Sequence, residues 1–140
     1  MRFLRSIGSM RSIGSMGFLL LASAIAASAQ SAGWDIPREA ASEASPLPDS
    51  PERVARGREI YEDSCRRCHG TDGTGNGPDA DPDDPAGDLT DGSRASRNPD
   101  GVMFYKIWNG RDDPEMPAFK SDLTREEIWT VIQYVKTLRR

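Results

Sequence analysis

The feature that most constrains this chain is its only two cysteines and only histidine, which fall within the segment Cys65-Arg66-Arg67-Cys68-His69. Three such side chains cannot complete a four-ligand zinc site of the Cys/His type. Two cysteines also exclude a framework of several disulfides. A Ser-His-Asp hydrolase would need this same histidine as its general base. The chemistry open to the chain therefore depends on this short segment.

Cys-x-x-Cys-His is the attachment signature of c-type haem. Two thiols three residues apart on a helical turn can each add to one vinyl group of the porphyrin, and the histidine that follows then lies beneath the iron. We therefore expect one covalent haem c on Cys65 and Cys68, with the iron bound by His69. The alternatives are a thioredoxin-like redox pair, which needs a βαβ context, a structural disulfide, and zinc, which lacks ligands.

A second axial ligand must come from another residue type, because the chain has no other histidine. Lysine is an uncommon choice, and the methionines beyond the N-terminal segment are Met103 and Met116. Met103 lies in a helical apolar pattern, which favours a core position. Met116 lies between Pro114 and Pro117, whose rings restrict the backbone, and it is our predicted ligand. A His/Met pair raises the reduction potential and leaves no open iron position, so we expect no enzymatic activity.

The chain opens with the pattern of a secretory signal. Three arginines precede an apolar stretch from Gly17 to Ala27, and small residues continue to Ala29. We predict a signal peptide over residues 1–29, with an uncleaved membrane anchor as the alternative, although the stretch is short for a membrane span. The predicted destination is the periplasm, which is an oxidising compartment, with no membrane association after cleavage.

Residues 30–49 are rich in Ala, Ser, Pro and Glu and lack a periodic apolar pattern, which predicts a flexible lead-in. The folded domain then covers residues 50–140. Signal cleavage removes three arginines and no acidic residue, so the formal charge falls from −4 to −7. A chain of this charge without a basic stripe is not expected to bind nucleic acid.

Three amphipathic segments predict helices. The first begins at Ser50-Pro51, where a capping hydroxyl precedes a proline at the first helical position. The second covers residues 98–109. The third begins at Thr124, which forms a capping box with Glu127, and it then follows the 3.6-residue apolar period over three turns.

A long polar loop over residues 70–97 joins the first two predicted helices. It holds six glycines and three prolines, and the chain shows no convincing strand pattern. Three short helices carry too little apolar side chain for a self-sufficient core. A loop of this length is therefore tolerable only if it wraps something large, such as a cofactor.

With these motifs in this order, the chain resembles class I c-type cytochromes, and is similar to the cytochrome c domains of cbb3-type oxidase subunits and dehydrogenase partner cytochromes. The matching stretches fall within residues 51–138: GREIY at 57–61, CRRCHG at 65–70, GTGNGP at 73–78, WNG at 108–110, MPAF at 116–119, and LT at 123–124 through YV at 134–135.

The resemblance implies an all-α cytochrome c fold, in which three main helices and long wrapping loops surround a covalently bound haem, and the first and last helices cross. It also implies that the carbonyl of Pro78 accepts a hydrogen bond from the ring of His69, which is how a ligating histidine is oriented. Trp108 and Arg111 are candidate partners of a haem propionate.

These expectations describe a periplasmic one-electron carrier, a monomer that exchanges electrons with a dehydrogenase, a quinol–cytochrome c reductase or a terminal oxidase. The alternative is a dedicated haem c subunit of a larger oxidoreductase, either a quinoprotein dehydrogenase or a terminal oxidase, with the lead-in as a tether. A gas sensor or peroxidase would need an open iron position.

Charge placement adds a hypothesis about docking. Arg66 and Arg67 lie between the cysteines, and six aspartates lie over residues 79–91. A molecule with charge separated in this way would be steered towards an oppositely charged partner. A solvated acidic loop without such a role is an equal alternative.

Overall fold

The computed structural model describes residues 33–113 and 115–140, so the predicted signal peptide lies outside the described residues. The described chain contains these elements: α1 (Arg38–Ala41), α2 (Pro51–Ser64), α3 (Arg66–His69), a 3₁₀-helix η1 (Gly92–Arg97), α4 (Asp100–Asn109), β1 (Arg111–Asp112), β2 (Glu115–Met116) and α5 (Arg125–Thr137). Within these ranges, no helix combines the length and the apolar character that crossing a bilayer requires.

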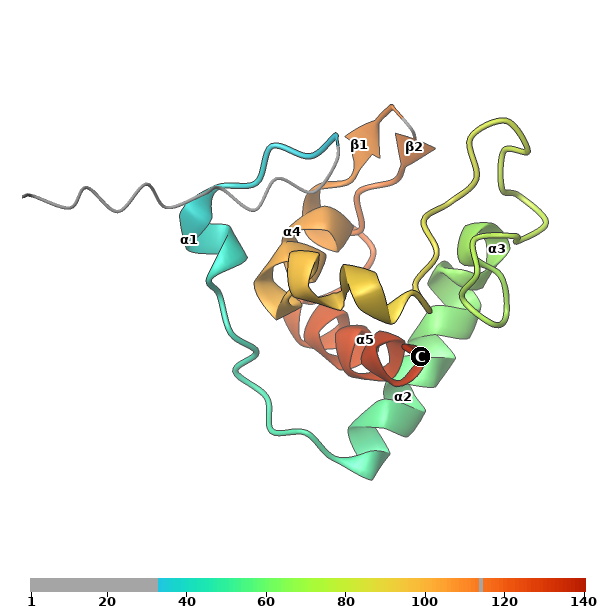
Figure 1. Cartoon of the computed structure of the whole chain (residues 1–140). Coiled ribbons are helices and arrows are strands. Elements are labelled where there is room, and N and C mark those ends of the chain that lie inside the picture. Colours follow the sequence, from blue (N-terminus) through green and yellow to red (C-terminus); the bar gives the residue numbers. More distant parts are fainter. Residues whose placement is uncertain (1–32, 114) are drawn as a thin grey trace, which may run out of the picture.

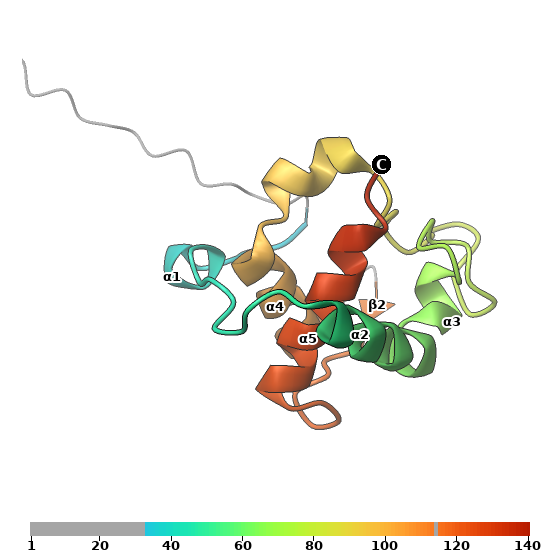
Figure 2. The same ribbon diagram turned by 90° about the horizontal axis from the view of Figure 1, so that it is seen from below.

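Helices α2 and α5 cross in the middle of the molecule (Figures 1 and 2). At the crossing, Gly57 lies so close to α5 that a Cβ atom there would meet the carbonyl oxygen of Thr130 and lie 3.0 Å from Cβ of Tyr134. Glycine in mid-helix costs about 1 kcal/mol relative to alanine, and this close approach explains its presence. One turn along α2, the rings of Tyr61 and Tyr134 are in contact, with centroids 5.3 Å apart. The expected contact between the first and last long helices is confirmed.

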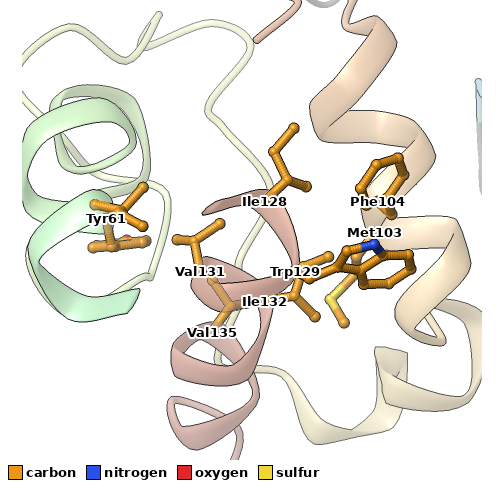
Figure 3. Packing of buried hydrophobic residues seen from close by; sticks show 9 residues of the cluster. Tyr61, Met103, Phe104, Ile128, Trp129, Val131, Ile132 and Val135 are labelled. Carbon is orange, nitrogen blue, oxygen red and sulfur yellow. The ribbon is translucent and has the colours of Figure 1, made fainter. Parts of the chain in front are cut away.

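Helix α5 supplies most of the buried core (Figure 3). The core cluster consists of Ile60, Tyr61, Met103, Phe104, Ile128, Trp129, Val131, Ile132 and Val135. The rings of Phe104 and Trp129 stack with centroids 4.3 Å apart, which ties α4 to α5. The apolar period predicted for the third helix is therefore the face that makes the core.

The predicted helix starts are confirmed by their caps. The hydroxyl of Ser50 accepts a hydrogen bond from the backbone N–H of Arg53 at 3.2 Å, and Pro51 is the first residue of α2. Thr124 and Glu127 form the reciprocal capping box at the start of α5. Each cap provides a partner for N–H groups that have none within the helix.

The loop of residues 70–97 contains more regular structure than the sequence predicts. Its last part forms η1, and Leu89 packs against the core. The C-terminus closes this part of the loop, because the backbone N–H of Arg140 donates to the carbonyl of Thr90 at 2.9 Å. Helix α4 then begins at Asp100, later than predicted, because the preceding proline has the extended backbone of an N-cap.

The structure also contains a strand pair that the sequence does not predict. β1 and β2 pair antiparallel, with Arg111 opposite Met116 and Asp112 opposite Glu115. Strands of two residues are too short to produce an alternating apolar pattern, so no signal of them exists in the sequence.

Residues 33–49, which we call the strap, differ from the predicted flexible lead-in because they pack along the helices. Their short helix α1 lies against α4. The carboxylate of Glu43 forms an ion pair with Arg125 on α5. The carbonyl of Pro48 accepts a hydrogen bond from the side-chain amide of Gln133 at 3.2 Å. The strap has few apolar residues, and the contacts of Glu43 and Pro48 are made by polar groups that leave no periodic pattern.

We expect Gly57→Ala to lower the free energy of unfolding by about 1–3 kcal/mol, because the added methyl group overpacks the helix crossing. Urea unfolding followed by far-UV circular dichroism measures this change. The control is Glu59→Ala, whose side chain is 64% exposed on α2; it should change the free energy by less than about 0.5 kcal/mol. An alanine variant as stable as wild type would contradict the close approach at Gly57.

Lys106 on α4 is partly buried beneath the strap. Its Nζ lies 5.3 Å from the ring centroid of Trp34 and donates to Oδ1 of Asn98 at 2.6 Å. Burial, helped by the positive charge of Arg111, lowers the pKa of Lys106 to about 8. The folded protein therefore releases this proton at a lower pH than the unfolded chain does.

The free energy of unfolding should rise as the pH is raised from about 8 towards about 10, because the unfolded chain binds more protons than the folded protein in this window. Lys106→Met should reduce this rise, whereas Lys120→Met, at an exposed position, should preserve it. Urea titrations at fixed pH values measure both effects. If the free energy of unfolding rises equally in Lys106→Met, the rise comes from another titratable group.

Candidate haem site

The Cys-x-x-Cys-His segment lies where α2 passes into α3. Cys65 caps the end of α2 and the start of α3, while Cys68 and His69 are the last residues of α3. Neither cysteine forms a disulfide, so both sulfurs are available for bonds to a porphyrin. Cys65 also packs against the core. The three side chains are thus presented on one short turn of helix.

The thiol of Cys65 does not have the properties of a redox-active cysteine. Burial, with a smaller effect from Cys68, raises the pKa of Cys65 to about 12. A thioredoxin-like pair needs a thiol with a lowered pKa, because the thiolate is the nucleophile. The helical surroundings also differ from the βαβ context of such a pair, so the thioredoxin-like alternative is disfavoured.

The imidazole of His69 is oriented by the backbone. Its Nδ1 lies 3.1 Å from the carbonyl oxygen of Gly87. A carbonyl only accepts hydrogen bonds, so Nδ1 carries the hydrogen, and the neutral ring keeps a lone pair on Nε2. Burial lowers the pKa of His69, against a smaller opposing effect of the Gly87 bond, so the ring is neutral at pH 7. This is the form in which histidine binds a metal.

The partner of the His69 ring is Gly87, and not Pro78 as the resemblance implied. The segment that contains Pro78 runs back along α3 instead. Its backbone N–H groups donate to the last carbonyls of the helix, in the pairs Gly75–His69, Gly77–Cys68 and Asp79–Arg67. These bonds satisfy carbonyls that a helix end leaves without partners. Because the segment is held by these bonds, a later part of the loop reaches the imidazole.

A buried tyrosine fixes the end of α3. Tyr61 is fully buried in α2, and its hydroxyl donates to the carbonyl of Gly70 at 2.7 Å. Burial raises the pKa of this hydroxyl, so it remains a donor. The bond connects the helix crossing to the residue that follows His69. The sequence did not reveal this function, because a tyrosine with helical apolar neighbours indicates only a core position.

Met116 is half-buried in β2. The segment that follows it is held to α4, because the backbone N–H of Phe119 donates to the carbonyl of Ile107 at 3.0 Å. In Figure 1 the strand pair and α3 both lie above α5, away from the start of α2. Met103 is instead in the core, where its sulfur lies 3.3 Å from a guanidinium nitrogen of Arg139, so the predicted core position of Met103 is confirmed.

The two predicted propionate partners lie in different surroundings. Trp108 stacks on Phe104 with centroids 5.7 Å apart, and the guanidinium of Arg125 lies over its ring. The guanidinium of Arg111 lies over Trp34, 4.8 Å from the ring centroid. Their contact with a propionate stays a prediction. Trp34 was missed by sequence reasoning, although a tryptophan in a stretch of small and polar residues is a signal of packing.

Several arginines near the cysteines form ion pairs. The pairs are Arg56–Glu59, Arg58–Glu62 and Arg67–Asp79. Such exposed pairs contribute little to stability and are screened by salt. Because two of these pairs lie within α2 and the third joins α3 to the loop, the predicted separation into a positive face and a negative loop is reduced.

Aspartates of the long loop form local turns. Four carboxylates, those of Asp72, Asp81, Asp88 and Asp91, each accept the backbone N–H of the residue two positions later. In three of these turns a hydroxyl donates as well, from Thr74, Thr90 and Ser93. These hydrogen bonds, the hydroxyl bond foremost, lower the pKa of Asp72, Asp88 and Asp91.

The donor set fits haem c better than zinc. In the part of the chain that the structure describes, no group of three or more His, Cys, Asp and Glu side chains could share a metal ion. Two cysteine sulfurs and an imidazole on one helical turn match the needs of thioether attachment and axial ligation.

Comparison with known proteins identifies the family. The family model for cytochrome c oxidase, cbb3-type, subunit III matches residues 52–135. No curated protein matches the chain. One similar solved structure is the "Kuenenia stuttgartiensis reducing HAO-like protein complex Kustc0457/Kustc0458", with 28% identity and a TM-score of 0.58; the match covers 68% of this chain and 47% of that one, about half its length.

A second similar structure is the "KustC0563 c-type cytochrome", with 28% identity, a TM-score of 0.52, and coverage of 60% of this chain and 98% of that one. The chain therefore belongs to the cbb3-type subunit III family of c-type cytochromes, the haem proteins of electron transport, and has their all-α cytochrome c fold with covalently bound haem c.

Proposed function

We propose that the chain is a periplasmic one-electron carrier in which Cys65 and Cys68 hold haem c through thioethers, and His69 and Met116 ligate the iron. The observation that carries the proposal is the helical turn in which the carbonyl of Gly87 orients the ring of His69 next to Cys65 and Cys68. When bound, haem iron supplies one-electron chemistry by alternating between the ferric and ferrous states.

The chain's own residues would orient the ligands and exclude water. Gly87 fixes the imidazole ring, and Tyr61 fixes the turn that carries it. Phe119 and Leu123 pack against the core next to the Met116 segment. Hydrogen bonding and burial around a redox centre are the means by which a protein tunes its potential. A thioether as second ligand would raise that potential further and would leave no position for a substrate.

A second candidate function is a dedicated haem c subunit of a larger oxidoreductase, such as a quinoprotein dehydrogenase or a terminal oxidase. The family description names an oxidase subunit, and one similar structure is a protein complex in which the match covers 47% of the matching chain. In either case the partners are redox proteins, with a dehydrogenase, a quinol–cytochrome c reductase or a terminal oxidase as donor or acceptor. Gel filtration of a native extract separates the two functions, because a free carrier elutes alone at monomer size.

The ferric holoprotein should show the far-red absorption band of a thioether bound to iron. Met116→Ala should abolish this band, because it removes the sulfur ligand, and should lower the reduction potential. Met103→Ala is the matched control, which should retain the band while lowering the free energy of unfolding by about 2–5 kcal/mol. A far-red band that survives in Met116→Ala would reject Met116 as the ligand.

The covalent bonds are tested in a host with cytochrome maturation machinery. In Cys65→Ser or Cys68→Ser, one vinyl group remains unsaturated, so the reduced pyridine haemochrome should absorb at a longer wavelength than in wild type. The double variant should release its haem into acidified acetone. A colourless wild-type protein from such a host would contradict haem attachment at this segment.

A further inference from the structure

The strap passes over the residue that pairs with Met116. Trp34 is half-buried, with the guanidinium carbon of Arg111 4.8 Å and Nζ of Lys106 5.3 Å from its ring centroid. A Cβ atom on Gly33 would lie 2.8 Å from Nη1 of Arg111, so the strap backbone also lies against this arginine. Cations over the face of an indole attract it, most strongly where water is partly excluded.

Arg111 is connected to Met116 through the backbone of the β1–β2 pair. The strand pair is preceded by Gly110, which has a φ of +62° and no room for a side chain. A Cβ atom there would meet the carbonyl oxygen of Met116 and lie 2.7 Å from the carbonyl carbon of Pro117. An isolated strand pair is at best marginally stable in water. Neighbouring segments must therefore hold the pair in place, and the strap is one of them.

The other end of the strap makes contacts away from the strand pair. Leu47 packs against the core. Glu43 pairs with Arg125, whose guanidinium lies 4.4 Å from the ring centroid of Phe104. These contacts fix the course of the strap along α4 and α5. A substitution at Trp34 should therefore affect the strand pair, whereas a substitution at Leu47 should affect the packing of the core.

We propose that Trp34 is a positioning residue for the sulfur ligand of the iron: by holding Arg111, it fixes the strand pair that presents Met116. The proposal rests on the proposed function, because it takes Met116 as the ligand. It also assigns a function to a segment that lies outside the family match at residues 52–135. Without Trp34, the strand pair should open while the helices remain folded.

The test uses the full-length holoprotein with Trp34→Ala, Trp34→Phe and the matched strap variant Leu47→Ala. Two quantities are measured in each: hydrogen exchange of the amides of residues 111–119, and the urea midpoint of the far-red band relative to that of far-UV circular dichroism. Trp34→Ala should speed exchange in this segment about tenfold. It should also move the loss of the band to a lower urea concentration than the loss of helix. Trp34→Phe should restore much of both, because it keeps an aromatic face over Arg111.

Leu47→Ala should shift the two urea midpoints together and leave the exchange of residues 111–119 unchanged relative to global unfolding. Exchange that is unaltered in Trp34→Ala, or equally accelerated in Leu47→Ala, would overturn the proposal. A third outcome combines a wild-type holoprotein that lacks the far-red band with faster exchange of residues 111–119 in Trp34→Ala. It would support the contact by which Trp34 holds the strand pair. That same result would reject Met116 as the ligand, so the two failures are distinguishable.

Discussion

The close approach of α2 and α5 at Gly57 and Thr130 is the constraint on which the other parts depend. It sets the two helices close enough for the ring of Tyr61 to lie against Tyr134. Tyr61 in turn donates to the carbonyl of Gly70, directly after the Cys-x-x-Cys-His turn. A side chain at Gly57 would separate the helices and move that hydroxyl. Packing at the helix crossing therefore helps to set the geometry of the site, through one buried hydrogen bond between residues nine apart in the sequence.

The helices and the attachment segment were predictable because their signals are local. A capping hydroxyl at Ser50, a capping box at Thr124, and a 3.6-residue apolar period are each contained within a few turns of chain. Cys65, Cys68 and His69 are recognised by spacing alone. Such features depend on backbone geometry that is nearly the same in every protein, so they can be read without knowledge of the tertiary structure.

The contacts around the site were not predictable for the opposite reason. Whether Gly87 or Pro78 reaches His69 depends on how a loop folds against α3, and both residues are plausible acceptors in the sequence. The strand pair is too short to produce a pattern. Trp34 meets Arg111 across more than half of the chain, a pairing that no local rule identifies. These are the parts of the molecule where tertiary structure decides between local alternatives.

The proposed ligands are supported by separate parts of the fold. The imidazole of His69 is held by the long loop, and its helical turn is held by α2. Met116 belongs to a strand pair between α4 and the strap. Local unfolding of the strand pair therefore need not unfold the loop that holds His69. This arrangement allows the two sides of the proposed iron site to differ in local stability, as is common between loops and core helices within one domain.

The aspartate turns of the long loop make part of its stability depend on ionised carboxylates. Hydrogen bonds to the carboxylates of Asp72, Asp88 and Asp91 hold their pKa below the ordinary value. A carboxyl of this kind contributes stability above the pKa of the unfolded chain, about 3.9, and loses it only as the pH falls through the lowered folded value. The turns therefore favour the folded loop at neutral pH, and this contribution is lost in strong acid, where the carboxyls become protonated.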